Sequence, residues 1–171
     1  MERQRLGRTE IKLETRHGRT TLTTARRHRR ARTGGGDQAF GLDMKILLTT
    51  EATGGAISVI MGWHKPGEGP PDHVHFNQEE MFFIVEGIYE LTVGDQTSTV
   101  GPGAIVFIPR NVVHRFKNVG DTTARMLDWS LPGGQDHYFK AISELGAGGG
   151  FTGEKVMEIT KKFDTNFPIA H

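Results

Sequence analysis

The sequence contains no cysteine, and its longest uninterrupted apolar runs, at 81–85 and 104–108, are short. Without thiols the chain cannot form a disulfide scaffold, a zinc ribbon, a thiolate nucleophile or a cysteine-ligated cluster. A membrane span needs about 20 consecutive apolar residues, and residues 1–36 contain no apolar segment of the kind found in secretory signals. We therefore expect a soluble, cytoplasmic protein without a membrane partner, in which histidines and carboxylates must hold any metal.

Charge is distributed unevenly along the chain, although the net charge is only +1. Residues 1–36 hold ten Arg and one Lys against three Glu, a net charge of +8, and the remaining residues hold 10 basic and 17 acidic side chains, a net charge of −7. The basic segment has too few large apolar residues to offset its chain entropy. We therefore predict that residues 1–36 form a disordered basic extension.

Four roles remain open for this basic extension. It can be a nucleic-acid-binding arm, a nuclear-type basic signal, an organellar transit peptide, or a solvated stretch upstream of a later start at Met44. No aromatic residue lies among its arginines, so a stacking surface for single-stranded nucleic acid is not indicated. We accordingly do not expect nucleic acid as a partner.

From about Gly36 the chain has short apolar runs separated by turn signals every eight to twelve residues. This texture is typical of a β-sandwich or β-barrel, and the 23 glycines and seven prolines suit its many tight turns. The predicted strands lie near 44–50, 56–63, 72–76, 80–86, 88–93, 96–100, 104–108, 113–118 and 123–130.

After Pro132 the apolar residues follow helical spacing instead, which predicts two short helices. The positions concerned are Phe139, Ile142 and Leu145, and then Val156, Ile159 and Phe163. A length of 171 residues fits one domain. We predict a mainly β, single-domain fold with three parts: the basic extension (1–36), a β-barrel (37–132) and a C-terminal helical segment that packs on the barrel (133–171).

Three histidines and an acidic residue have the spacing of a metal site. His73 and His75 are two residues apart in a predicted strand, so their side chains project to the same face. Glu79 and Glu80 begin the next strand and point to opposite faces, so only one of them can join the histidines. His114 places a third imidazole at the start of another strand. These donors suit one divalent transition metal, Fe, Mn, Ni, Cu or Zn, with positions left for water or substrate.

These residues lie in a frame that resembles two sequence motifs of the cupin superfamily. The first motif has a glycine, two paired histidines, a glutamate and a second glycine at fixed separations, which are matched here by Gly67, His73, His75, Glu80 and Gly87. In that motif six residues separate the acid from the second glycine. This separation selects Glu80 over Glu79 as the fourth ligand.

The second cupin motif is matched with one departure. Its fixed positions correspond to Gly103, Pro109, His114 and Asn118, but Asn111 stands where the family has a glycine. Asparagine tolerates the left-handed backbone conformation better than other non-glycine residues. We therefore expect the turn at this position to persist.

In further detail the chain resembles small single-domain cupins similar to quercetin dioxygenase. The resemblance implies a double-stranded β-helix, also called a jelly-roll barrel, with His73, His75, Glu80 and His114 pointing into its mouth as metal ligands. Small organic substrates would bind beside them. The residues that we assign to the barrel interior and the substrate pocket are Trp63, Phe82, Ile84, Phe116, Met126 and Trp129.

Residues 81–85 are apolar at both parities, which predicts a strand that is covered on both faces. The barrel interior would cover one face. The C-terminal segment or a second subunit would cover the other. Because single-barrel cupins often dimerise, we expect a homodimer.

The metal site and the resemblance favour an enzyme. Our first hypothesis is a dioxygenase-type oxidoreductase that acts on a small enolisable or phenolic molecule, with the metal as Lewis acid and Glu80 as ligand or catalytic base. An alternative is an oxygen-independent isomerase, cyclase or decarboxylase, because enolate stabilisation needs only the cation. A further alternative is a binding module that senses a small ligand, although residues 1–36 show no helix-turn-helix pattern.

Overall fold

The computed structural model describes residues 11–16, 19–24, 37–39, 42–148 and 152–168, which fall into two units, Met1–Gly35 and Gly36–His171. In the first unit, β1 (Ile11–Arg16) and β2 (Arg19–Thr24) pair as antiparallel strands. This hairpin lies within the basic extension, for which no strand was predicted, although the threonines of β2 favour an extended backbone. The other residues of the predicted extension lie outside the described ones.

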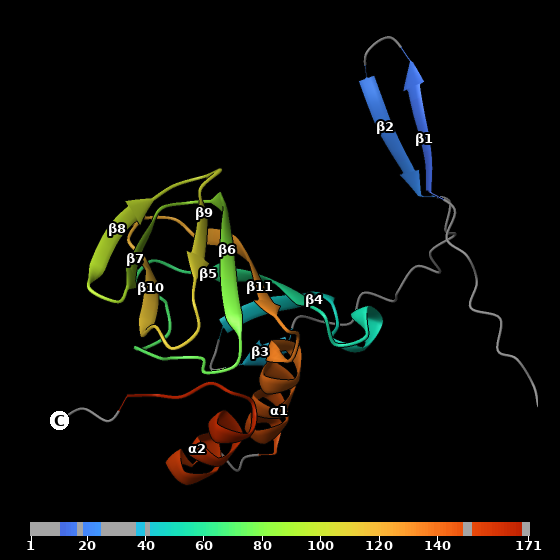
Figure 1. The fold of residues 1–171 in the computed structure, drawn as a ribbon. Helices are drawn as coiled ribbons and strands as arrows, with labels where there is room; N and C mark the ends of the chain where they lie inside the picture. Colours follow the sequence, from blue (N-terminus) through green and yellow to red (C-terminus); the bar gives the residue numbers. More distant parts are fainter. Residues whose placement is uncertain (1–10, 17–18, 25–36, 40–41, 149–151, 169–171) are drawn as a thin grey trace, which may run out of the picture. The chain divides into compact units, whose positions relative to one another are not determined.

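The second unit contains two antiparallel β-sheets (Figure 1). The larger sheet has the order β3-β4-β5-β11-β6-β9, formed by Asp37–Ala39, Leu42–Leu48, Ser58–His64, Ala124–Leu131, Glu79–Glu86 and Ile105–Ile108. The smaller sheet has the order β10-β7-β8, formed by His114–Asn118, Tyr89–Val93 and Gln96–Val100. The strands β3, β4 and β5 are consecutive in the chain, whereas β11 pairs with both β5 and β6, and β6 pairs with β9, so distant parts of the chain are joined as in a jelly roll.

Burial alternates along the strands and identifies the face of each sheet that lies inside the barrel. Every second residue of β5 and of β6 is buried, and the residues between them are partly exposed. Buried residues from both sheets form an apolar cluster inside the barrel, made of Phe82, Ile84, Tyr89, Leu91, Ile108, Phe116, Ala124 and Met126. This arrangement confirms the predicted mainly β jelly-roll fold.

Residues 72–76 do not form the regular strand that the sequence analysis predicted. His73 and His114 exchange two backbone hydrogen bonds of 3.0 and 2.8 Å, and Val74 makes a separate bridge to Asn166. Pro71 stands directly before this segment, and a proline cannot donate to a sheet ladder. The segment is therefore extended but held only by these isolated bridges.

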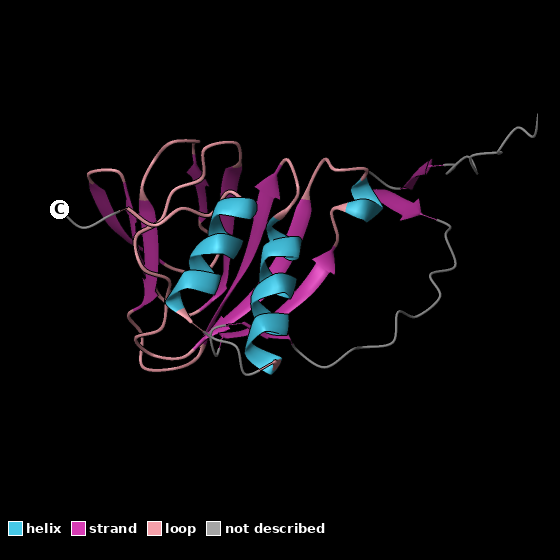
Figure 2. Ribbon diagram, turned by 90° about the horizontal axis from the view of Figure 1, so that it is seen from below, coloured by secondary structure: helices cyan, strands magenta, loops and turns pink. Residues whose placement is uncertain are grey.

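Two helices, α1 (Gln135–Ala147) and α2 (Gly153–Lys162), lie side by side on the larger sheet (Figure 2), and a short 3₁₀ helix, η1 (Glu51–Thr53), follows β4. Tyr138 and Ile142 of α1 are buried together with Met44 and Ile60 of the sheet, and apolar residues of α2 pack against this cluster. No helix among the described residues is long and apolar enough to cross a membrane.

Two turns require unusual backbone conformations. Gly87 has a φ of 84°, and a Cβ added there would lie 2.3 Å from the Cβ of Ala124, so no side chain fits. Asn111 has a φ of 64°, in the left-handed region that was expected for it. The backbone N–H of Asn111 donates to the carbonyl of His75 at 2.8 Å. This turn therefore ties the two motif segments together.

Candidate metal centre and cavity

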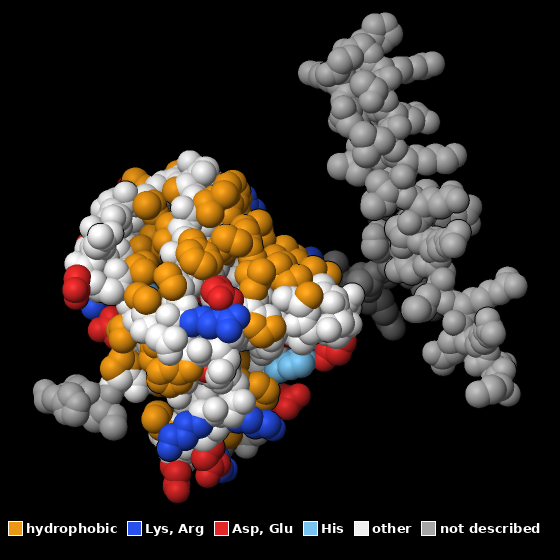
Figure 3. Space-filling view, viewed as in Figure 1, with side chains coloured by type: hydrophobic (Ala, Val, Ile, Leu, Met, Phe, Trp, Pro, Cys, Tyr) orange, Lys and Arg blue, Asp and Glu red, His pale blue; other side chains and the backbone are white. Residues whose placement is uncertain are grey.

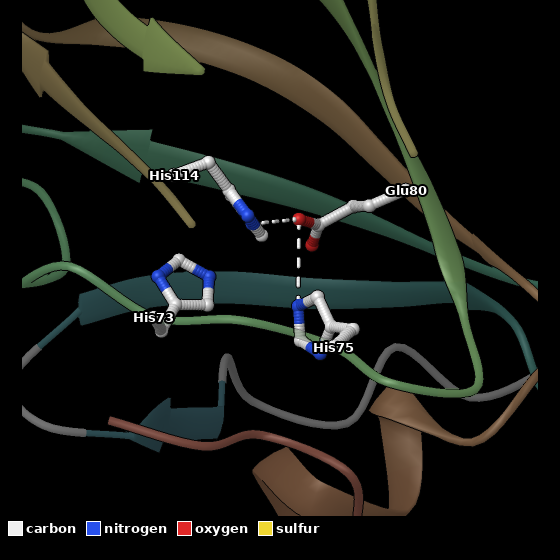
Figure 4. Close-up of side chains that lie close together, drawn as sticks. All are labelled: His73, His75, Glu80 and His114. Carbon is white, nitrogen blue, oxygen red and sulfur yellow. Dashed lines mark hydrogen bonds and ion pairs between the residues drawn. The ribbon is translucent and has the colours of Figure 1, made fainter. Parts of the chain in front are cut away.

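Four side chains converge inside the barrel from three separate segments (Figure 4). His73 and His75 lie in the extended segment that follows the paired prolines, Glu80 is the second residue of β6, and His114 is the first residue of β10. All four are buried, and their ligand atoms lie within 4.8 Å of one another. These are the four residues that the sequence predicts as metal ligands, and they could hold one metal ion.

Backbone carbonyls fix the nitrogen that each imidazole presents to the centre. The three hydrogen bonds run from Nδ1 to a carbonyl oxygen: His73 to Pro71 (2.9 Å), His75 to Asp164 (2.7 Å) and His114 to Val112 (2.9 Å). A carbonyl oxygen can only accept, so each Nδ1 carries the proton and donates it. Each Nε2 is therefore available to a cation, which is the usual arrangement for metal-binding histidines.

The donors that face the centre lack sufficient protein partners. His75 Nε2 is buried without a hydrogen bond among the described residues, and it lies 3.6 Å from Oε2 of Glu80. His114 Nε2 lies 2.8 Å from the same oxygen. Buried polar atoms without partners are unusual in folded proteins. A cation between these atoms would satisfy them, and three nitrogens with one carboxylate oxygen fit a divalent transition metal.

Burial and neighbouring charges shift the pKa values of these groups. Burial lowers the pKa of His73 to about 4, which keeps this imidazole neutral at pH 7. Burial also acts to lower the pKa of His75, but the nearby carboxylate of Glu80 outweighs it and raises this pKa. Burial opposes ionisation of Glu80, yet the neighbouring imidazoles of His114 and His75 hold its pKa well below its usual range. Glu80 is therefore an anion, as metal binding requires.

Glu79 and Glu80 point to opposite faces of β6. Glu80 is only 2% exposed, and its Oε1 accepts a hydrogen bond of 2.5 Å from Nε2 of Gln135. Glu79 instead forms an ion pair with Arg110, in which Oε1 and Nε lie 2.9 Å apart. Sequence reasoning missed Gln135, because this residue lies at the start of α1, outside both motifs and 55 positions from Glu80.

The segment that follows α2 holds the loop that carries His75. Asp164 has a φ of 59°, and its carbonyl accepts the Nδ1 proton of His75. Its carboxylate accepts hydrogen bonds from the backbone N–H groups of Phe76 (3.0 Å) and Asn77 (2.7 Å). The C-terminal segment is therefore part of the candidate metal centre, which no pattern in the sequence indicated.

A cavity of about 410 Å³ opens beside His73 and Glu80. Its walls come from both sheets, from α1 and from the C-terminal segment, and most of them are apolar. The remaining lining residues are Met44, Ile60, Gly62, His64, Gly69, Pro70, Pro71, Phe116, Met126, Asp128, Gln135, Tyr138, Phe139, Thr165 and Phe167. A cavity of this size suits a small organic molecule.

Four of the predicted pocket residues lie inside the barrel, but only two line the cavity. Phe116 and Met126 contribute to its wall. Phe82 and Ile84 are fully buried in the apolar core and do not line the cavity. Their assignment to the substrate pocket is therefore corrected to a packing role.

The two tryptophans lie on the outer face of the larger sheet. Trp63 precedes the inward-facing His64, and Trp129 precedes the inward-facing Ser130, so alternation turns both indoles away from the barrel interior. Trp129 is paired with Met81 of β6. Trp129 was expected inside the barrel by alternation and Trp63 near its mouth, but the strand registers give both residues the opposite parity.

Three polar residues of the cavity were not predicted from the sequence. Asp128, Gln135 and Thr165 each have one side-chain oxygen without a hydrogen bond among the described residues. Burial, and secondarily the charge of Glu80, raise the pKa of Asp128 well above its usual range. Parity could have found Asp128, because it lies two residues from Met126 on the same strand face.

A jelly-roll barrel that gathers three histidines and one glutamate inside its mouth is the architecture of a cupin. Residues 64–130 match the cupin domain family. This match over part of the chain supports a small cupin superfamily protein, in agreement with the resemblance seen in its two motifs.

Three relatives and one solved structure illustrate these similarities. Protein SchB of Streptomyces halstedii is 37% identical over 89 residues, which cover 51% of this chain and 64% of that protein. Polyketide synthase CurC of Streptomyces cyaneus is 39% identical over 89 residues, or 51% and 57% of the two chains. Quercetin 2,3-dioxygenase of Bacillus subtilis is 25% identical over 113 residues, or 65% and 33%.

The similarity therefore spans less than two thirds of the length of each of these relatives. Among solved structures, an RmlC-like cupin from Shewanella frigidimarina superposes with a TM-score of 0.52 at 20% identity. That match covers 62% of this chain and 89% of the other. At this level of identity it supports the fold alone.

Proposed function

We propose that this chain is a metal-dependent oxygenase that acts on a small enolisable or phenolic molecule. The observation that carries the proposal is the buried cluster of His73, His75, Glu80 and His114, whose donors face one point beside a mostly apolar cavity of about 410 Å³. A divalent metal bound there would supply Lewis acidity to a substrate oxygen.

The cavity suits a planar organic substrate better than a highly charged one. Phe116, Met126, Tyr138 and Phe139 give it apolar walls. Near Glu80, the free Oε1 of Gln135 can accept a hydrogen bond from a substrate hydroxyl. The same Gln135 side chain holds Glu80 from the other side, so the carboxylate is fixed toward the histidines.

The relatives support this substrate class. One relative is named as a polyketide synthase, and polyketides carry keto groups that enolise readily. Another relative is named as a dioxygenase of quercetin, which is a polyphenol. Both names agree with a substrate that presents an enol or phenol oxygen.

An oxygen-independent isomerase, cyclase or decarboxylase is the second candidate. It is favoured by the polyketide-related name, because enol and enolate chemistry needs a Lewis acid but no oxidant. The four donors serve this reaction class equally well. Dioxygen dependence is therefore the property that separates the two candidates.

Turnover with and without dioxygen tests the proposal. The apoprotein would be loaded separately with Fe(II), Mn(II), Ni(II), Cu(II) or Zn(II) and offered quercetin, 1,3-dihydroxynaphthalene or acetylacetone under air and under argon. We expect product and oxygen consumption under air only, retained in Glu79→Ala and abolished in His75→Ala. Product under argon would assign the second candidate. Absence of turnover with every metal and probe would overturn the enzymatic proposal in favour of a ligand sensor.

A further inference from the structure

A fourth buried histidine lines the cavity outside the candidate metal centre. His64 is the last residue of β5 and is 4% exposed. Its ring meets the ring of Phe116 edge-on, with centroids 4.8 Å apart. None of the four candidate ligands contacts it through a hydrogen bond among the described residues. His64 belongs to neither cupin motif, so the ligand pattern leaves its role open.

The backbone and the side chain of His64 are both held in place. The carbonyl of His64 accepts a hydrogen bond of 2.8 Å from Nδ2 of Asn118, and its Nδ1 lies 2.8 Å from the hydroxyl oxygen of Tyr89. Tyr89 is itself fully buried. A Cβ at Gly62 would lie 2.8 Å from Cε1 of the ring, so the glycine provides the space that the imidazole occupies. The ring is therefore fixed in one orientation before any ligand arrives.

The nitrogen that remains, Nε2, has no hydrogen-bond partner within the part of the chain that the structure describes. A histidine that served packing alone would normally have both nitrogens paired or exposed to bulk water. Here the ring lines a mostly apolar cavity instead. Burial lowers the pKa of His64 to about 4, so the ring is neutral at pH 7 and suits a neutral polar atom better than a carboxylate.

Tyr89 determines what Nε2 can do. If the tyrosine hydroxyl donates to Nδ1, then Nε2 carries the proton and donates; if Nδ1 donates to the hydroxyl, then Nε2 accepts. A hydroxyl group on the ligand satisfies either tautomer, because it can both donate and accept. The chemical group that fits this position is therefore an alcohol or phenol oxygen.

Phe116 lies between the candidate metal centre and His64. It follows His114 by two residues on the same face of β10, which is a rise of about 6.6 Å along the strand, and its ring contacts that of His64. One aromatic side chain therefore forms an apolar wall that runs from the histidine ligands toward His64, and a flat aromatic ligand can lie along it.

We propose that His64, oriented by Tyr89, binds a second oxygen of the substrate, so that the preferred ligand is a fused-ring compound with one oxygen at the metal centre and a hydroxyl at the opposite end. This inference rests on the proposed function for the first oxygen only. His64 is then a substrate-contacting residue that determines specificity.

Two probes that differ by one remote hydroxyl test this assignment without turnover. 2-Naphthol and 2,7-dihydroxynaphthalene would be titrated into the Zn(II)-loaded full chain by calorimetry. We expect the diol to bind the wild type about tenfold more tightly, the value of one neutral hydrogen bond in a protein. His64→Phe should reduce this preference to within about twofold. His137→Phe is the matched control, because His137 lies outside the cavity, and it should keep the preference.

Nuclear magnetic resonance gives a second readout that does not depend on a variant folding. The ¹⁵N resonance of His64 Nε2 should shift when the diol binds and stay unchanged with 2-naphthol. Tyr89→Phe, which keeps the ring and removes the hydroxyl, should weaken the preference for the diol.

Equal affinity of the two probes for the wild type, an unchanged Nε2 resonance, or failure of both probes to bind would overturn the assignment. A retained preference in folded His64→Phe would overturn it as well. The proposed function fails separately, when no metal and probe combination gives turnover although the binding preference is present.

Discussion

At the residue scale, the candidate metal centre depends on which atom each donor presents. Three backbone carbonyls accept hydrogen bonds from the Nδ1 atoms of the histidines, and Gln135 donates a hydrogen bond to one oxygen of Glu80. The remaining donor atoms face one another inside the barrel. The orientation of the four candidate ligands is therefore set by hydrogen-bond partners, the backbone carbonyls and Gln135, that are not themselves candidate ligands.

Separate substitutions of the two neighbouring glutamates distinguish the metal ligand from the surface residue. We predict that Glu80→Gln lowers zinc affinity by more than about tenfold, because it removes the only anionic donor of the cluster. Glu79→Gln should keep wild-type affinity, since Glu79 pairs with Arg110 on the other face. Competition with a chromophoric chelator measures both affinities. An equal loss in the two variants would contradict the assignment of Glu80.

Protonation of His64 should make the metal-free protein less stable in acid. Its pKa is about 4 in the folded state and 6.5 when unperturbed, so between these values the unfolded chain binds more protons and the free energy of unfolding falls as pH falls. The shift corresponds to about 2 kcal/mol between pH 7 and pH 5. Burial is the main cause, and the charge of Glu68 opposes it.

Urea unfolding in the presence of a chelator tests this pH dependence. Wild type should lose stability between pH 7 and pH 5, and His64→Phe should lose about 2 kcal/mol less. His73 is shifted in the same direction and should keep part of the acid sensitivity in the variant. Identical losses in the two proteins would show that His64 remains unprotonated in both states or titrates equally in both.

At the scale of elements, the C-terminal segment is joined to the first motif. Asp164 accepts from His75 through its carbonyl and from two backbone N–H groups of the next residues through its carboxylate. Asn166 adds a bridge to Val74. The segment after α2 therefore fixes a loop that otherwise has few sheet hydrogen bonds.

Removing the carboxylate of Asp164 should weaken metal binding without unfolding the barrel. Asp164→Gly keeps the left-handed backbone and loses the side-chain bonds, and we predict about tenfold weaker zinc affinity. Asp164→Asn retains one acceptor oxygen and should restore most of the affinity. A cobalt(II) absorption spectrum reports whether the ligand geometry changes with it. Wild-type affinity and spectrum in Asp164→Gly would show that the Asp164 carboxylate does not position the loop that carries His75.

Local patterns predicted most elements and the ligands, whereas contacts between distant segments were not predictable. Alternation in an extended segment puts His73 and His75 on one face, whereas the selection of Glu80 and the convergence of His114 on this pair followed from the resemblance to the two cupin motifs. Gln135 and Asp164 act from elements whose placement depends on packing of the whole unit. The residues next to Gln135 and Asp164 in the sequence form no motif that would predict these hydrogen bonds to Glu80 and His75.

At the scale of the whole molecule, apolar side chains gather on the face of the second unit that Figure 3 shows, and the strand registers place two cross-strand rows of them on the outer face of the larger sheet. The rows follow the strand registers and are Phe107, Met81, Trp129 and Val59, and Ile105, Phe83, Leu127 and Met61. Ile105 and Phe107 of the edge strand β9 are 64% and 55% exposed. Trp129, which was expected in the pocket, is thus part of this outer surface.

We propose that a second copy of this chain covers the outer face, because an exposed apolar sheet face beside an edge strand favours association. The charged residues Glu79 and Arg110 on this face form an ion pair, so they add no net charge that would repel a second copy. Sedimentation equilibrium should show a dimer. Phe107→Glu should weaken the dimer by roughly thirtyfold or more, as expected for a buried aromatic anchor. Met157→Glu changes an apolar residue of α2 that is 39% exposed and should leave the dimer intact. A wild type that remains monomeric, or equal weakening by both substitutions, would place the interface elsewhere.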